Sequence, residues 1–160
     1  MNNSNSENKS LEELYRQLII HHAKKPLNFG KPKNYSLFAE GINPLCGDKI
    51  RIYLNINEAD TIEELTFEGT GCAISIASAS LMTATLANVK KYQANEYATG
   101  LISNLNGPKS EIMEHTIINS QEINALKGVK DFPSRIKCAT LGWQTLIAAF
   151  NNNKITTTEK

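Results

Sequence analysis

Hydrophobic and polar residues alternate along one central stretch of the chain. Apolar residues occupy every second position from Ile50 to Ile56. The positions between them carry Lys49, Arg51, Tyr53 and Asn55. A period of two places one set of side chains on each face of a strand, so residues 49–56 predict a half-buried strand of an antiparallel sheet. Residues 36–42 and 62–68 predict two neighbouring strands, and the short links between the three favour a meander.

Two longer stretches repeat their hydrophobic residues with helical spacing. In the first, Ser10 and Glu13 form a capping box, apolar residues follow at every third or fourth position, and Pro26 ends the pattern. The second begins near Pro133 and continues to about Phe150. Its apolar stripe consists of Ile136, Ala139, Thr140, Trp143, Leu146, Ile147 and Phe150. Both patterns predict amphipathic helices.

The segment between these helices predicts further helical structure. Residues 73–88 are rich in alanine and serine, which favours a buried helix that packs closely on the sheet. Residues 89–130 are less regular. Within them we expect helices over 95–105, 111–118 and 122–126.

Length and composition predict one domain. A chain of 160 residues is large enough for a single core. We expect residues 1–9 to be disordered, residues 10–150 to form the domain, and residues 151–160 to be a polar tail. Seventeen basic and sixteen acidic residues give a net charge of +1, which disfavours nucleic-acid binding. The sequence has neither an apolar run of the roughly 20 residues that span a bilayer nor a secretory signal, so we expect a cytoplasmic protein without membrane contact.

The three cysteines, Cys46, Cys72 and Cys138, carry the candidate chemistry. Each lies at the boundary of a predicted element, and Asp48 follows the first of them by two positions. An odd number of cysteines fits a disulfide framework poorly. In a reducing compartment, cysteines are more often metal ligands, nucleophiles or core residues. Three thiolates and one carboxylate that converge would match a tetrahedral site for Zn²⁺ or an iron centre.

The candidate ligands differ in hardness, and together they carry a large negative charge. Asp48 is expected to exchange most easily, because a carboxylate is a harder ligand than a thiolate. Zn²⁺ with three thiolates and one carboxylate has a net charge of about −2, which favours a nearby cation. Arg135 and Lys137 flank Cys138 and are candidates for this charge support. Alternatively, both are solvated residues at the start of a helix.

The three histidines are weaker candidates for metal binding or catalysis than the cysteines. His21 and His22 are adjacent on a predicted helix and point about 100° apart, so they do not easily share one metal ion. We expect both to be structural or surface residues, and His115 to lie on the surface. A cysteine-dependent hydrolase would need a histidine base near Cys46 or Cys72, and we rank this alternative last.

Motifs around the cysteines and near the N-terminus extend over about residues 11–150. They are residues 15–16, 25–26, 28–30, 43–48, 69–75, 77–80 and 135–141. Together they resemble the U-type iron–sulfur cluster assembly proteins, SufU and IscU. The resemblance implies an α+β fold with a three-stranded antiparallel sheet and helices packed on it. It also implies that Cys46, Asp48, Cys72 and Cys138 bind metal, and that a cysteine desulfurase delivers sulfur as a persulfide.

Two departures from the IscU branch favour the SufU-like branch. IscU proteins have a Leu-Pro-Pro-Val-Lys chaperone motif where this chain has residues 132–137, and a histidine where it has Lys137. In addition, 66 positions separate Cys72 from Cys138, which accommodates the insertion typical of SufU-like proteins. The resemblance therefore implies a zinc-bound acceptor of persulfide sulfur, with Cys46 as the acceptor and a SufS-like desulfurase as the partner.

Two further alternatives use the same ligands. In the first, the protein is a scaffold that binds iron or a [2Fe–2S] cluster and passes the cluster to apo iron–sulfur proteins or other Suf components. In the second, it is a structural zinc module that binds a protein partner without chemistry. The alternatives differ in the bound metal and in whether Cys46 reacts.

Overall fold

The computed structural model describes residues 3–108 and 121–159. Its elements, of which η1 and η2 are short 3-10 helices, are α1 (Asn3–Lys24), β1 (Leu37–Asn43), β2 (Asp48–Ile56), β3 (Ile62–Thr70), α2 (Ala73–Leu86), α3 (Lys91–Asn106), α4 (Gln121–Leu126), η1 (Lys127–Asp131), η2 (Pro133–Arg135), α5 (Ile136–Phe150) and β4 (Ile155–Thr157). The helix expected over residues 111–118, which includes His115, lies outside the described residues. None of the helices in the described part is both long and apolar enough to cross a bilayer.

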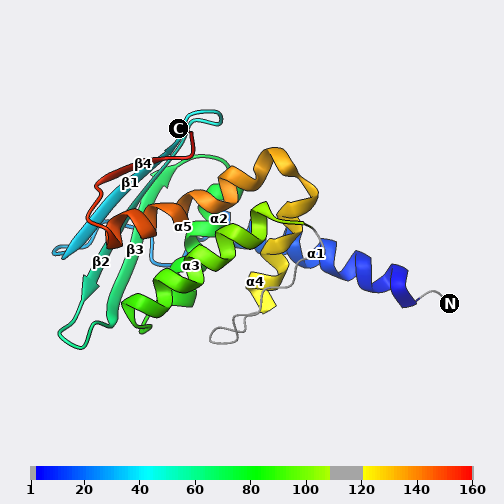
Figure 1. The fold of residues 1–160 in the computed structure, drawn as a ribbon. Coiled ribbons are helices and arrows are strands. Elements are labelled where there is room, and N and C mark those ends of the chain that lie inside the picture. The colour runs from blue at the N-terminus through cyan, green and yellow to red at the C-terminus, as the bar shows by residue number, and fades with distance from the viewer. Residues whose placement is uncertain (1–2, 109–120, 160) are drawn as a thin grey trace.

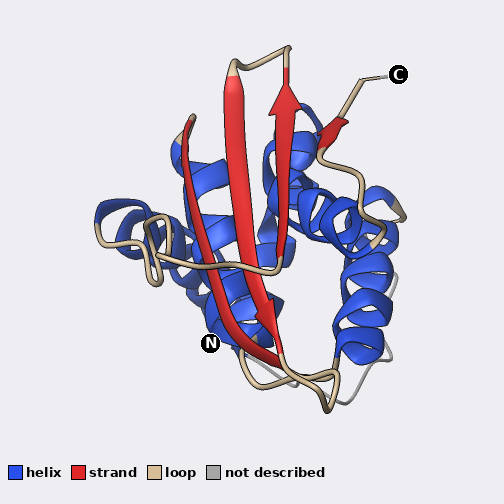
Figure 2. Ribbon diagram, turned by 90° about the vertical axis from the view of Figure 1, so that its left-hand side faces the viewer, coloured by secondary structure: helices blue, strands red, loops and turns tan. Residues whose placement is uncertain are grey.

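The sheet has four strands in the order β3-β2-β1-β4 (Figure 2). Strands β1, β2 and β3 form the expected antiparallel meander. Strand β4 pairs in parallel with β1, in the register Glu40↔Ile155, Gly41↔Thr156 and Ile42↔Thr157. The prediction of an antiparallel, three-stranded sheet is therefore corrected to a mixed sheet of four strands, in which β4 lies within the expected polar tail. Strand β4 has only three residues, and it forms because the outer edge of β1 offers backbone partners.

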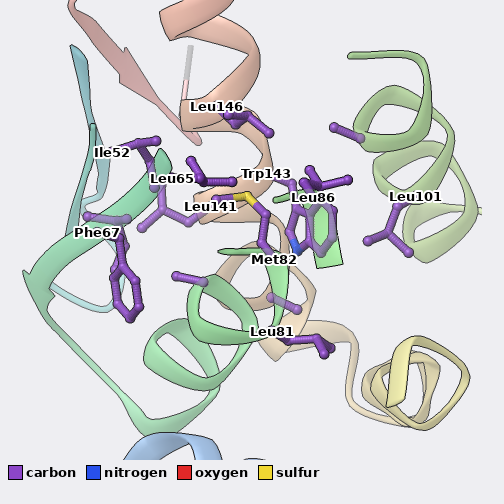
Figure 3. Packing of buried hydrophobic residues seen from close by; sticks show 14 of the residues in the cluster. Ile52, Leu65, Phe67, Leu81, Met82, Leu86, Leu101, Leu141, Trp143 and Leu146 are labelled. Atoms are coloured by element: carbon purple, nitrogen blue, oxygen red, sulfur yellow. The ribbon is translucent and has the colours of Figure 1, made fainter. Parts of the chain in front are cut away.

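The helices pack on one face of the sheet and enclose the core (Figure 1). Ile52 and Phe67 of the strands belong to one buried cluster with Met82 of α2 and Trp143 of α5 (Figure 3). Helices α2 and α5 approach each other closely where a Cβ at Gly142 would lie only 3.2 Å from the Cβ of Ala79. The small residues of the predicted buried helix thus allow the close packing that the sequence indicates.

The opposite face of the sheet carries an aromatic cluster. Tyr53 belongs to the polar set of β2, yet only 3% of it is exposed. The rings of Tyr35 and Phe38 cover it, with centroids 5.0 Å and 5.3 Å from its own. Its hydroxyl donates a hydrogen bond of 2.6 Å to Glu68 Oε1. Alternation therefore places Tyr53 on the correct face but does not reveal that its neighbours bury it.

Helix α1 begins at Asn3 rather than at the predicted capping box of Ser10. Residues 3–9, which the sequence analysis expects as a disordered lead-in, belong to this helix. No glycine or proline interrupts this segment, and adding a residue to an existing helix requires no new nucleation.

Farther along α1, His22 is buried and its Nδ1 lies 2.8 Å from Ser80 Oγ, which agrees with the expected structural role.

Candidate metal centre

The site forms where three parts of the fold meet. Cys46 lies in the turn that joins β1 to β2, and Asp48 is the first residue of β2. The N–H of Gly47 closes this turn on the carbonyl of Asn43 at 2.9 Å, and Gly47 has φ +74°, which favours glycine. Cys138 lies in the first turn of α5.

Cys46, Asp48 and Cys138 each offer one ligand atom, and these atoms all lie within 4.8 Å of one another. The Cys138 thiol donates to Cys46 Sγ across 3.6 Å. Asp48 and Cys138 are fully buried, whereas Cys46 is exposed. Among the residues that the structure describes, this is the only such group of three or more histidine, cysteine or acidic side chains.

Cys72 lies beside this group as the N-cap residue of α2. Its backbone N–H donates to Asp48 Oδ1 at 2.8 Å, and its Sγ lies 3.6 Å from Ser75 Oγ. The charge on Cys72 raises the pKa of the Cys138 thiol, although Cys72 is not a member of the three-residue group. The structure thus brings three of the four predicted ligands together and places the fourth next to them.

The environment of Cys138 accumulates negative charge. Burial raises the pKa of its thiol, and the charge on Cys72 raises it further. The side-chain interactions with Cys72 and Cys46 and the charge on Asp48 also raise this pKa. The thiol therefore stays protonated unless a cation offsets these effects. A metal ion would supply this charge, and soft thiolates with one carboxylate suit zinc or iron. The donor set fits the metal centre that the sequence predicts.

Asp48 is held firmly in the folded chain. Its Oδ2 accepts a hydrogen bond of 3.3 Å from Asn43 Nδ2, in addition to the bond from Cys72 to Oδ1. Gly71 packs so closely that an added Cβ would lie 2.5 Å from Asp48 Oδ1. The prediction that Asp48 exchanges most easily rests on ligand hardness alone. Accessibility favours exchange at the exposed Cys46 instead.

Arg135 and Lys137 differ in their surroundings. Lys137 forms an ion pair with Glu159, so its charge is already balanced. Arg135 is exposed and has no ion-pair partner in the described part of the chain. Burial and the charge on Cys72 raise the pKa of Tyr15, and the charge on Arg135 lowers it. Because Arg135 and the cysteines act on the same hydroxyl, Arg135 is the better candidate for charge support.

Two residues that the sequence analysis does not assign to the site form hydrogen bonds in or next to it. The side chain of Asn43 is only 1% exposed and also donates to Cys138 Sγ at 3.7 Å. Thr158, in the expected polar tail, donates through its hydroxyl to Asn43 Oδ1 at 3.2 Å. The position of Asn43 just before the Cys-x-Asp turn is a weak signal, since a buried amide requires partners. No sequence pattern marks Thr158.

The family model for the NifU-like N terminal domain matches residues 14–139. The chain belongs to this family. This NifU-like chain is 40% identical, over 141 residues, to the zinc-dependent sulfurtransferase SufU of Bacillus subtilis (strain 168), with 87% of this chain and 90% of that protein covered. It is 33% identical, over 143 residues, to the iron–sulfur cluster assembly scaffold protein IscU of Streptococcus pyogenes serotype M1, with 89% and 86% covered.

The fold of this family member also matches solved structures. The crystal structure of the FiSufU protein of Fervidobacterium islandicum AW-1 superposes with a TM-score of 0.75 at 32% identity, with 86% of this chain and 96% of that chain covered. The resemblance to SufU and IscU that the cysteine motifs indicate is therefore confirmed, and so is the α+β fold.

Proposed function

We propose that the protein acts in iron–sulfur cluster assembly as a zinc-bound acceptor of persulfide sulfur from a cysteine desulfurase. The convergence of an exposed Cys46 with a buried Asp48 and a buried Cys138 carries this proposal. The name of the Bacillus subtilis relative, a zinc-dependent sulfurtransferase, supports the same reaction.

Four side chains would hold the metal ion. Cys46, Asp48 and Cys138 have donors within 4.8 Å of one another. Cys72 is the proposed fourth ligand because its backbone N–H binds Asp48 and its charge acts on the Cys138 thiol. When bound, Zn²⁺ would keep the ligating thiols as thiolates at neutral pH. Asp48, fixed by its two hydrogen bonds, would hold its place while the more accessible Cys46 leaves.

Cys46 would carry out the transfer. Its thiolate attacks the outer sulfur of the partner's persulfide, a new S–S bond forms at Cys46 Sγ, and the partner's S–S bond breaks. The partner's cysteine leaves as a thiolate, so one sulfur atom moves and no external oxidant or reductant is needed. The sulfur is then passed to apo iron–sulfur proteins or to other Suf components.

The test measures metal content, desulfurase turnover and sulfur on Cys46. We expect about one zinc per chain by metal analysis, and faster turnover of a SufS-like desulfurase when the protein is added. Mass spectrometry should find one extra sulfur atom on Cys46. Cys46→Ala should abolish both the stimulation and the persulfide. A Cys46→Ala protein that stimulates like the wild type would refute the assignment.

A second candidate function is a scaffold for a [2Fe–2S] cluster. The IscU relative from Streptococcus pyogenes, named as a scaffold, favours it. Anaerobic reconstitution with iron and sulfide, followed by transfer to an apo acceptor, would distinguish the two. A structural zinc module would behave differently again, because zinc removal would unfold the chain while Cys46→Ala would not affect the desulfurase.

A further inference from the structure

The C-terminal segment reaches the candidate metal centre through one buried amide. Asn43 donates from Nδ2 to Asp48 Oδ2 at 3.3 Å and to Cys138 Sγ at 3.7 Å. Its Oδ1 accepts from the Thr158 hydroxyl at 3.2 Å. A continuous chain of hydrogen bonds therefore runs from Thr158 through Asn43 to two of the candidate ligands.

The hydroxyl of Thr158 fixes which way the Asn43 amide faces. Only the NH₂ end of an amide can donate to a carboxylate, so a flipped amide would turn its oxygen toward Asp48 and repel it. The Thr158 hydroxyl donates at the opposite end and satisfies Oδ1 in the productive orientation. Because Asn43 is buried, water does not readily replace either partner.

Thr158 is itself anchored by the strand that precedes it. Its N–H donates to the carbonyl of Ile42 at 3.0 Å, which continues the β1–β4 pairing past Thr157. Gln144 of α5 donates to the carbonyl of Thr157 at 2.8 Å. On the far side of Thr158, Glu159 pairs with Lys137. These contacts hold the hydroxyl of Thr158 against the amide of Asn43.

We infer that Asn43 and Thr158 are positioning residues of the metal centre, and that the C-terminal segment is part of the centre. Asn43 holds Asp48 and Cys138 in place, and Thr158 holds Asn43. Outer hydrogen bonds of this kind orient metal ligands and tune their affinity. The inference rests on the proposed metal-binding function. It assigns a role in metal binding to the C-terminal segment, which contributes no ligand.

Zinc affinity of Thr158 variants tests the inference. Thr158→Val keeps the shape and the backbone N–H but removes the hydroxyl, so we expect the zinc dissociation constant to rise about tenfold in competition with a chelator. Thr158→Ser keeps the hydroxyl and should bind zinc like the wild type. Thr156→Val is the matched control, because the Thr156 hydroxyl accepts a hydrogen bond from Gln144 rather than donating to Asn43.

A double-mutant cycle separates positioning from general stabilisation. In an Asn43→Ala background, Thr158→Val should change zinc affinity no further, because the amide through which it acts is gone. Urea unfolding of the zinc-free variants reports on folding independently of the metal. If Thr158→Val fails to fold, Thr158→Ala takes its place in the same comparison.

The possible outcomes are distinct. If the wild type binds zinc tightly and Thr158→Val binds it equally well, the inference is wrong and the proposed function stands. The same holds if Thr158→Val lowers only the stability of the zinc-free protein. If the wild type binds no zinc, the proposed function fails and this inference fails with it.

Discussion

The backbone N–H of Cys72 donates a hydrogen bond of 2.8 Å to Asp48 Oδ1. This bond joins the start of α2 to the start of β2, so two of the four predicted ligands position each other even before a metal ion is considered. Asp48 is fully buried, and a buried carboxylate requires such donors. The stability of the centre therefore depends on backbone that contributes no ligand atom.

Gly71 provides the space for this bond, and Gly71→Ala should weaken metal binding. The added methyl group would lie 2.5 Å from Asp48 Oδ1, so the carboxylate must move. We expect the zinc dissociation constant to rise about tenfold. Gly30→Ala is the control, since an added Cβ there meets no atom within 4 Å. The interpretation would be wrong if both variants bound zinc like the wild type.

The three thiols of the zinc-free protein should react with an alkylating reagent in the order Cys46, Cys72, Cys138. Cys46 is exposed, Cys72 is half-buried and Cys138 is buried. Burial and the neighbouring charges also raise the pKa of Cys138, which lowers its thiolate fraction. Timed alkylation followed by peptide mass spectrometry should show Cys46 reacting about tenfold or more faster than Cys138. Bound zinc should slow all three, and equal rates for Cys46 and Cys138 would contradict the geometry.

Ser78 joins α2 to α5 next to the centre, and Ser78→Ala should destabilise the fold. Its hydroxyl donates to the carbonyl of Ala139 at 2.5 Å and accepts from Trp143 Nε1 at 2.9 Å. The buried indole N–H would lose its partner, at a cost of about 2 kcal/mol in the free energy of unfolding, measured with urea. Thr99→Ala, on an exposed position of α3, should cost less than about 0.5 kcal/mol. A similar loss in both variants would show that the buried hydroxyl has no special role.

Local patterns were sufficient to predict most of the fold. Alternation along β2 identifies its buried face, since Ile50, Ile52 and Leu54 are all fully buried. The stripe of α5 likewise predicts that Trp143 faces the core. Strand β4 could not be predicted in this way, because a strand of three residues in a polar segment is too short to show a periodic pattern. It forms only by pairing with the edge of β1.

The candidate site was predictable to a different degree. Cys46, Asp48 and Cys138 stand out by residue type, and the structure brings their donors together. The roles of Asn43 and Thr158 depend on hydrogen bonds between residues far apart in the chain, so no local pattern contains them. The types of the residues are enough to predict the candidate ligands. The side chains that form hydrogen bonds to these ligands can be identified only from the tertiary structure.

Alkaline pH should destabilise the protein through Tyr97. Burial raises the pKa of Tyr97 to about 12. In the unfolded chain a tyrosine ionises near about 10, so the stabilising contribution is complete below that pH and is lost as the pH rises toward 12. Thermal midpoints between about pH 9 and 11 should therefore fall less steeply for Tyr97→Phe than for the wild type. Tyr92→Phe, at an exposed position, should follow the wild-type curve.

Arg135 and Lys137 provide the sharpest test of charge support, because they flank the same cysteine and differ in pairing. Zn²⁺ with three thiolates and one carboxylate has a net charge of about −2, so it repels an anionic sulfur donor. Arg135 has no ion-pair partner in the described chain and can offset this repulsion, whereas Glu159 already balances Lys137.

Arg135→Gln should therefore slow sulfur uptake by Cys46 from glutathione persulfide, an anionic donor, by about tenfold at low salt. Lys137→Gln should slow it by less than about twofold, because an exposed ion pair contributes little. Raising the ionic strength should bring the Arg135→Gln and wild-type rates together, since screening weakens the repulsion that Arg135 counters. The guanidinium of Arg135 does not act through its charge if both variants slow sulfur uptake by the same factor. The same conclusion follows if the Arg135→Gln and wild-type rates still differ in high salt.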